Sequence, residues 1–349
     1  MNPGPGVDGM RRWARAAVVL GAILTLAPPG VDAQAPNRQA VVVYVWDAAA
    51  GVEPPEFFDA FRETLRALGR AEGPRLRIER RIVSAIEDRP RVGAEITALR
   101  PDVIVAPAPA ALVFGPVPER IGARVRHWSP IHGIPIVFSG ISDPIGFGMV
   151  QSLARPSGTM TGITTIAADL NVKRLQLLKD TLPRLTRVGV IVNPTHPLRV
   201  QWVQELAAAG RSLSVEIQMV EVPVDDPPDH AFQDLLRGRA QAVLGLPSAS
   251  FFRDRKRIGE LALMHRLPTM FESVDFAEAG CLMAYAPNGV EMSRQAAEFA
   301  DKLLKGARPE TLPVDQPRKL DLLVNVKTAR ALGLTIPPAI LLRADRLIE

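Results

Sequence analysis

The side chains of this chain that could do chemistry follow short apolar runs, which are typical of buried strands. Asp143 and Glu272 each come shortly after such a run. Either carboxylate could pair with an ammonium group, because a buried ammonium needs a charged partner. Trp46 and Tyr285 lie in or at the end of other apolar runs and could stack on an aromatic or apolar ligand. These residue types predict binding of a small organic molecule.

A second set of candidates stands where predicted strands end, or in a Gly-, Ser- and Thr-rich segment between them. Ligands of open α/β sheets bind at the carboxyl ends of the strands. The helix N-termini that follow would present free backbone N–H groups to an anion such as a carboxylate. These further candidates are Ala108, Ser139, Thr164, Asn193 and Ser248.

Most of the candidates also have a purely structural interpretation, and the sequence leaves both interpretations open. Asp143 precedes Pro144, and this pair fits a turn or a cap as well as a ligand contact. Asn193 and Ser248 fit helix caps. Trp46 fits a position in the core.

The sequence carries no catalytic signature. It has no Gly-x-Ser-x-Gly elbow, no Walker A loop and no His-Glu-x-x-His motif. None of the five histidines has another histidine three or four residues away, and the single cysteine, Cys281, belongs to no ligand cluster. The sequence therefore predicts no metal, no cofactor and no enzymatic activity.

The N-terminus has the pattern of a secretory signal. Arginines within 11–15 precede an apolar segment at 16–26 that is short for a membrane span, and a small-residue cleavage site ends at Ala33. We expect residues 1–33 to be removed and the rest to lie in the periplasm without membrane insertion. The net charge of +5 demands no nucleic-acid partner.

A repeated motif organises the rest of the chain. Residues 132–138 recur as 265–271, and the apolar run 102–107 that precedes the first copy has a counterpart at 241–247. So long a period indicates two lobes of similar design, and a cleft between lobes suits a small ligand. Apolar runs alternate with amphipathic helical stripes in both halves, which predicts parallel sheets covered by helices on both faces.

We therefore expect an α/β fold of two doubly wound parallel-sheet lobes joined by hinge crossovers. The first lobe would comprise 34–141 and 282–319, and the second 142–281, with 320–349 packing across both. The expected connections between the lobes are 139–165, 272–280 and 312–319.

Several segments of the sequence belong together as a family pattern. The most specific is DPIGFGMVQSLARPSG at 143–158, which continues to Thr161 and Gly162, and 173–175, 302–306 and 332–338 add to it. In these segments the chain resembles the ABC-transporter substrate-binding proteins of the tryptophan/tyrosine type. The resemblance covers essentially the whole chain after the expected signal peptide, and it implies a type I periplasmic-binding fold.

The resemblance also implies a function. It implies a non-catalytic receptor that binds a small solute, such as an amino acid or aromatic compound, and delivers it to an inner-membrane ABC permease with its separate ATPase. It makes Asp143 the expected polar contact, with Asn193 and Ser248 on the second lobe. The chain departs from the family at 106–109, where Ala-Pro-Ala-Pro stands in place of a loop that often carries a hydroxyl residue. Two other functions stay open: a sensory binding protein for a membrane kinase or chemoreceptor, and an exported α/β enzyme.

Overall fold

The computed structural model describes residue 1 and residues 38–48, 53–108, 110–111, 133–165 and 167–349. Residues 39–349 belong to one unit. The expected signal peptide at 1–33 lies outside the described residues, apart from Met1. Among the described residues, no helix combines the length and the apolar character needed to cross a membrane.

The first lobe is built on a five-stranded sheet with the order β2-β1-β3-β4-β5, and every neighbouring pair is parallel. Alternate residues of β1 belong to two different core clusters, because successive side chains of a strand point to opposite faces of the sheet. The continuous Val-rich run in β1 is thus explained by burial on both faces. The strands are β1 Ala40–Asp47, β2 Leu76–Val83, β3 Val103–Pro107, β4 Ile136–Ile141 and β5 Met160–Thr164.

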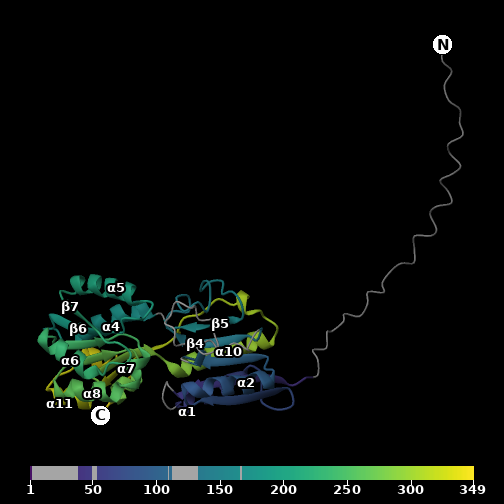
Figure 1. The fold of residues 1–349 in the computed structure, drawn as a ribbon, viewed down its shortest axis with the longest axis horizontal. Helices are drawn as coiled ribbons and strands as arrows, with labels where there is room; N and C mark the ends of the chain where they lie inside the picture. The colour runs from purple at the N-terminus through teal and green to yellow at the C-terminus, as the bar shows by residue number, and fades with distance from the viewer. Residues whose placement is uncertain (2–37, 49–52, 109, 112–132, 166) are drawn as a thin grey trace. The chain divides into compact units, whose positions relative to one another are not determined.

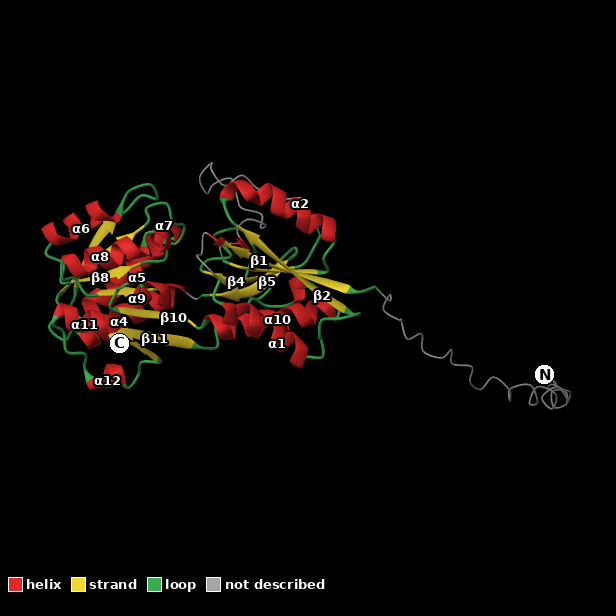
Figure 2. Cartoon of the chain, turned by 90° about the horizontal axis from the view of Figure 1, so that it is seen from below, coloured by secondary structure: helices red, strands yellow, loops and turns green. Residues whose placement is uncertain are grey.

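Helices cover both faces of this sheet. Helices α1 (Pro55–Ala67) and α10 (Gly289–Leu304) pack against one face, and α2 (Arg89–Leu99) packs against the other (Figure 2). Helix α10 comes from far along the chain, as its yellow-green colour beside the blue strands shows (Figure 1). The first lobe is therefore completed by a late segment of the sequence.

The second lobe is built on a seven-stranded sheet among the described residues, with the order β12-β11-β10-β9-β8-β6-β7. Neighbouring strands are parallel except β10 and β11, which are antiparallel. The strands are β6 Arg187–Val192, β7 Glu216–Glu221, β8 Ala242–Gly245, β9 Thr269–Phe271, β10 Met283–Pro287, β11 Leu320–Asn325 and β12 Arg346–Ile348.

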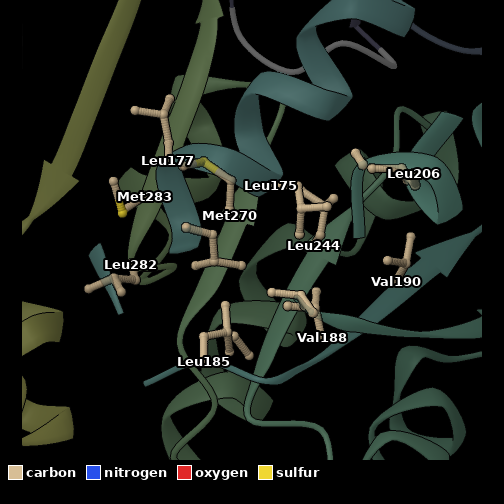
Figure 3. Packing of buried hydrophobic residues seen from close by; sticks show 14 of the residues in the cluster. Leu175, Leu177, Leu185, Val188, Val190, Leu206, Leu244, Met270, Leu282 and Met283 are labelled. Atoms are coloured by element: carbon tan, nitrogen blue, oxygen red, sulfur yellow. The ribbon is translucent and has the colours of Figure 1, made fainter. Parts of the chain in front are cut away.

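The helices of the second lobe also form two layers. One core cluster joins α4 (Ala167–Thr181) and α5 (Arg199–Ser212) to the sheet, and Figure 3 shows Leu175 and Leu177 of α4 among side chains of β6, β8 and β9. A second cluster joins α6 and α8 to the opposite face. The remaining helices of this lobe are α6 Pro228–Arg237, α7 Ala249–Arg253, α8 Arg255–Met264, α9 Val274–Glu278, α11 Val326–Leu332 and α12 Pro338–Leu341.

The two-lobed α/β fold is as expected, but several expected boundaries are wrong. We expected the chain to return to the first lobe at 282, yet β10 is hydrogen-bonded between β9 and β11 in the second sheet. The return comes with α10. Segment 320–349 does not pack across both lobes, because β11 and β12 extend the second sheet. Segment 142–165 does not open the second lobe, since β5 pairs with β4.

The observed connections between the lobes therefore also differ from the expected ones. Segment 272–280 is no crossover, because it contains α9 inside the second lobe. The chain crosses after β5 and again between β10 and α10. It crosses once more along 312–319, as expected, where the short 3-10 helix Pro309–Thr311 leads towards β11. The backbone N–H of Thr164 donates to Asp315 O (3.0 Å), and that of Asn288 donates to Lys319 O (2.9 Å), so the crossing segments are tied together.

Candidate ligand-binding site

The carboxyl ends of parallel strands meet at one edge of a sheet, where ligands of open α/β folds bind. In the first lobe this edge carries Trp46, Ala108, Ser139 and Thr164 at or beside the ends of β1, β3, β4 and β5. The sheet therefore brings four of the predicted residues to a common edge. These four residues differ in burial and in the contacts that they already make.

Trp46 occupies a core position. It is 7% exposed, and its ring lies edge-on to Phe57 with the ring centroids 6.3 Å apart. Ser139 and Thr164 are also buried, and the Thr164 hydroxyl donates to Ile141 O at 2.9 Å. Ala108 is half-buried, and its N–H donates to Ser139 O at 2.8 Å. Ligand contact by these four residues stays a prediction.

Asp143 forms the turn that its sequence context allowed. Its Oδ1 accepts from the backbone N–H of Gly146 at 2.7 Å, and its carbonyl accepts from the N–H of Phe147 at 3.0 Å. A carboxylate that accepts a backbone hydrogen bond stabilises a local turn. The turn interpretation is thus confirmed for Oδ1, while the expected contact with a ligand stays a prediction.

Asn193 follows β6 at the edge of the second sheet and does not cap a helix. Its Oδ1 accepts from the backbone N–H (3.0 Å) and the hydroxyl (2.9 Å) of Thr195, and α5 begins only at Arg199. The helix-cap interpretation of Asn193 is therefore wrong, because the side chain closes a local turn instead.

Ser248 precedes α7 at the N-cap position, as the sequence allowed, but its side chain makes no capping hydrogen bond. Its Oγ lies 2.8 Å from Oγ of Ser250. The two hydroxyls lie beyond the carboxyl end of β8, next to the strand that leads to Glu272. Contact of Ser248 with a ligand stays a prediction.

A buried polar cluster lies beneath this edge of the second lobe, and its centre is Arg174 of α4. Helix α4 leads into the start of β6, so its first turns lie towards the carboxyl edge of the sheet. Arg174 is 2% exposed; its Nε donates to the carbonyl of Tyr285 in β10 at 2.8 Å. Its Nη1 donates to Oδ1 of Asn171 at 2.7 Å. The guanidinium is thus held in one orientation from two sides.

Glu272 comes directly after β9 and completes the cluster. The residue is half-buried, but its Oε2 is buried and has no hydrogen-bond partner among the described residues. Burial raises the pKa of Glu272 to about 7, opposed by the charge of Arg174 and by the backbone N–H groups of Glu272 and Ser248. Burial also lowers the pKa of Arg174 to about 10, opposed by Glu272 and Tyr285.

The cluster contains a second buried polar atom without a partner. The amide Nδ2 of Asn171 makes no hydrogen bond within the described part of the chain, although Asn171 is only 1% exposed. A buried donor or acceptor that stays unpaired costs about 1–3 kcal/mol. An unpaired acceptor on Glu272 and an unpaired donor on Asn171 therefore flank the same guanidinium.

Sequence reasoning found Glu272 and Tyr285 but assigned no role to Asn171 or Arg174. Both stand in the helix whose apolar stripe includes Leu175 and Leu178. The available signal was a charged residue directly beside apolar positions of a buried helix, since a buried charge needs partners. No group of three or more His, Cys, Asp or Glu suited to a metal ion occurs among the described residues.

Comparisons with known proteins give a consistent picture. The model of a family described as ABC transporter substrate binding protein matches residues 123–348. A curated relative, the tyrosine-binding protein of Clostridioides difficile (strain R20291), is 23% identical over 203 residues. That match spans 58% of this chain and only 57% of the relative.

Solved structures share the fold. A conserved domain protein of Vibrio cholerae superposes with a TM-score of 0.71 at 22% identity, covering 89% of this chain and all of the other. An ABC domain from Streptococcus pneumonia in complex with L-Trp superposes with a TM-score of 0.69 at 18% identity, with the same coverage. The type I periplasmic-binding fold expected from the sequence is thereby confirmed.

Proposed function

Since the chain belongs to the ABC transporter substrate binding protein family, we propose that it is a periplasmic receptor for an amino acid with an aromatic side chain. It binds this solute without chemical change and delivers it to an inner-membrane permease that a separate ATPase drives. Residues 1–33 act as its export signal and are removed. One similar protein binds tyrosine and another was solved in complex with L-Trp, and both ligands support the solute class.

The observation that carries the proposal is the polar cluster at the carboxyl edge of the second sheet. A receptor for a small charged solute needs a few polar groups fixed in an otherwise apolar lobe. Arg174 is fixed by Tyr285 and Asn171, and Glu272 has an oxygen without a partner. Ligands of open α/β folds bind at the carboxyl ends of the strands, which supports a ligand site at this cluster. Members of the family are substrate-binding proteins.

The test is a binding screen on the exported protein, expressed as the full chain and purified. Tyrosine, tryptophan and phenylalanine are compared with arabinose, glucose and myo-inositol in a thermal-shift assay, followed by calorimetry. A ligand at a hundredfold excess over its Kd stabilises the folded state by about 2.7 kcal/mol. Stabilisation by an aromatic amino acid alone supports the proposal, and stabilisation by sugars alone overturns the solute class.

Two further measurements address export and transport. The N-terminal sequence of the purified protein should begin at Gln34. Cells that lack the gene should lose uptake of the labelled solute, and the gene supplied in trans should restore it. Normal uptake in the deletion strain, with binding intact in the purified protein, would favour a sensory role over transport.

A further inference from the structure

We propose that Glu272, Asn171 and Arg174 together recognise the charged head group of the ligand, a zwitterion of adjacent ammonium and carboxylate groups. This inference rests on the proposed function and assigns it a site within the second lobe. Glu272 takes the ammonium group, while Asn171 and Arg174 take the carboxylate.

Two buried polar atoms of this cluster have no hydrogen-bond partner among the described residues. Buried polar groups in native proteins are almost always paired, so each exception needs an explanation. Glu272 Oε2 lacks a donor and Asn171 Nδ2 lacks an acceptor within the described residues. A zwitterionic head group supplies both at once, since ammonium donates and carboxylate accepts.

The charges of the cluster also suit a zwitterion. Arg174 and Glu272 influence each other electrostatically, yet no ion pair within 4.0 Å joins them in the described part of the chain. Two of the guanidinium's nitrogens are used by Tyr285 O and Asn171 Oδ1. The cation is therefore held in place by neutral groups, and its charge stays available to an anion. An ammonium beside Glu272 and a carboxylate beside Arg174 compensate both charges.

The residues of the cluster stand on rigid elements of the second lobe. Asn171 and Arg174 lie three residues apart on α4, and residues at this spacing share one face of a helix. Leu175, Leu177 and Leu178 anchor that helix in the core of the lobe. Glu272 keeps part of its surface exposed at the end of β9. The recognising groups thus stand on a rigid scaffold with access from one edge, which favours preorganised binding.

Two other candidate residues, Asp143 and Asn193, already use a side-chain oxygen in a local turn. Oδ1 of Asp143 already accepts from Gly146, and Oδ1 of Asn193 already accepts twice from Thr195. A ligand that used these oxygens would compete with the turns they hold. The cluster around Arg174 has unpaired atoms and needs no such exchange.

The experiment compares the affinities of three probes for four proteins by calorimetry. The probes are L-tyrosine, tyramine, which lacks the carboxylate, and 3-(4-hydroxyphenyl)propionic acid, which lacks the ammonium. The proteins are the unaltered chain, Glu272→Gln, Asn171→Ala and a control, Glu278→Gln. Glu278 is exposed on α9 and pairs with Arg346 Nη2 at 2.7 Å, outside the cluster.

Hydrogen bonds to charged groups are worth enough that Glu272→Gln should weaken L-tyrosine binding about 10- to 100-fold. The same variant should bind the propionic acid unchanged, because that probe has no ammonium to lose. Asn171→Ala should weaken L-tyrosine but leave tyramine unchanged. The control should behave like the unaltered chain with all three probes.

The outcomes separate this inference from the proposed function. If the unaltered chain binds L-tyrosine and Glu272→Gln weakens tyrosine and the propionic acid equally, the head-group assignment is overturned while the receptor function stands. Unchanged tyrosine affinity in both cluster variants overturns it as well. If the unaltered chain binds no aromatic amino acid in the screen above, the proposed function itself fails.

Discussion

Replacing Glu272 by Gln should change how the stability of the ligand-free protein depends on pH. Burial raises the pKa of this carboxyl from 4.5 to about 7. The charges and dipoles that face it are Arg174 from α4, Asp275 from α9 and the backbone N–H groups of Glu272 and Ser248. A Gln side chain has nearly the same shape but no proton to gain or lose.

The sign follows from proton linkage. A group whose pKa is higher in the folded state binds its proton more tightly there, so folding loses stability as pH rises from the unfolded pKa to the folded one. Each pKa unit corresponds to 1.36 kcal/mol, so the shift of Glu272 corresponds to at most about 3 kcal/mol, lost between about pH 4.5 and 7. The stabilisation is complete below this window, and no further loss occurs above it.

Urea unfolding of the purified protein at pH 5, 6, 7 and 8 measures the effect. The unfolding free energy of Glu272→Gln minus that of the unaltered chain should increase by about 2–3 kcal/mol from pH 5 to pH 8, because only the unaltered chain loses the stabilisation. Glu278→Gln serves as the matched control and should follow the unaltered chain at every pH. A difference between Glu272→Gln and the unaltered chain that is constant across this range, or that falls with pH, would refute the reasoning.

Two other substitutions test the packing and the crossovers. Gly245→Ala would place a Cβ 1.9 Å from a ring carbon of Phe271, so we expect a loss of about 1–3 kcal/mol in urea unfolding, and an unchanged midpoint would show that the ring moves aside freely. Asn288 caps α10 through the N–H of Glu291 and also donates to Asp321, so Asn288→Ala should cost about 1 kcal/mol. Asn288→Ser keeps a capping acceptor without adding charge, so it should retain the cap but lose the tie to β11. Equal losses in both variants would contradict the capping role.

The architecture followed from the sequence because its signals are local. The Val-rich run in β1 is apolar on both faces, so a strand buried on both sides can be predicted from it without knowledge of its neighbours. The strand β5 was missed because its Gly and Thr residues suggested a connection. Its second residue, Thr161, is nevertheless buried, and its hydroxyl donates to Leu312 O at 2.7 Å.

Assignment of strands to lobes could not be made the same way. The run at 282–285 predicts a strand wherever it lies, and nothing in its apolar pattern names its neighbours. Strand β10 joins the second sheet through long-range pairing, with Tyr285 opposite Leu322 of β11. That pairing depends on residues almost forty positions later, so only the three-dimensional structure reveals it.

At the candidate site, too, the residue types can be predicted from the sequence but the contacts between residues cannot. The sequence identified Glu272 as a carboxylate after a buried strand, but Asn171 and Arg174 looked like ordinary members of a helix. Their importance arises from contacts across the fold, since Arg174 reaches the backbone of β10 more than a hundred residues away. The unpaired atoms of Asn171 and Glu272, and not their residue types, distinguish this cluster from the turns at Asp143 and Asn193. Hydrogen-bond accounting therefore selects among polar residues that the sequence cannot rank, because a ligand gains most where the protein has left a buried group unpaired.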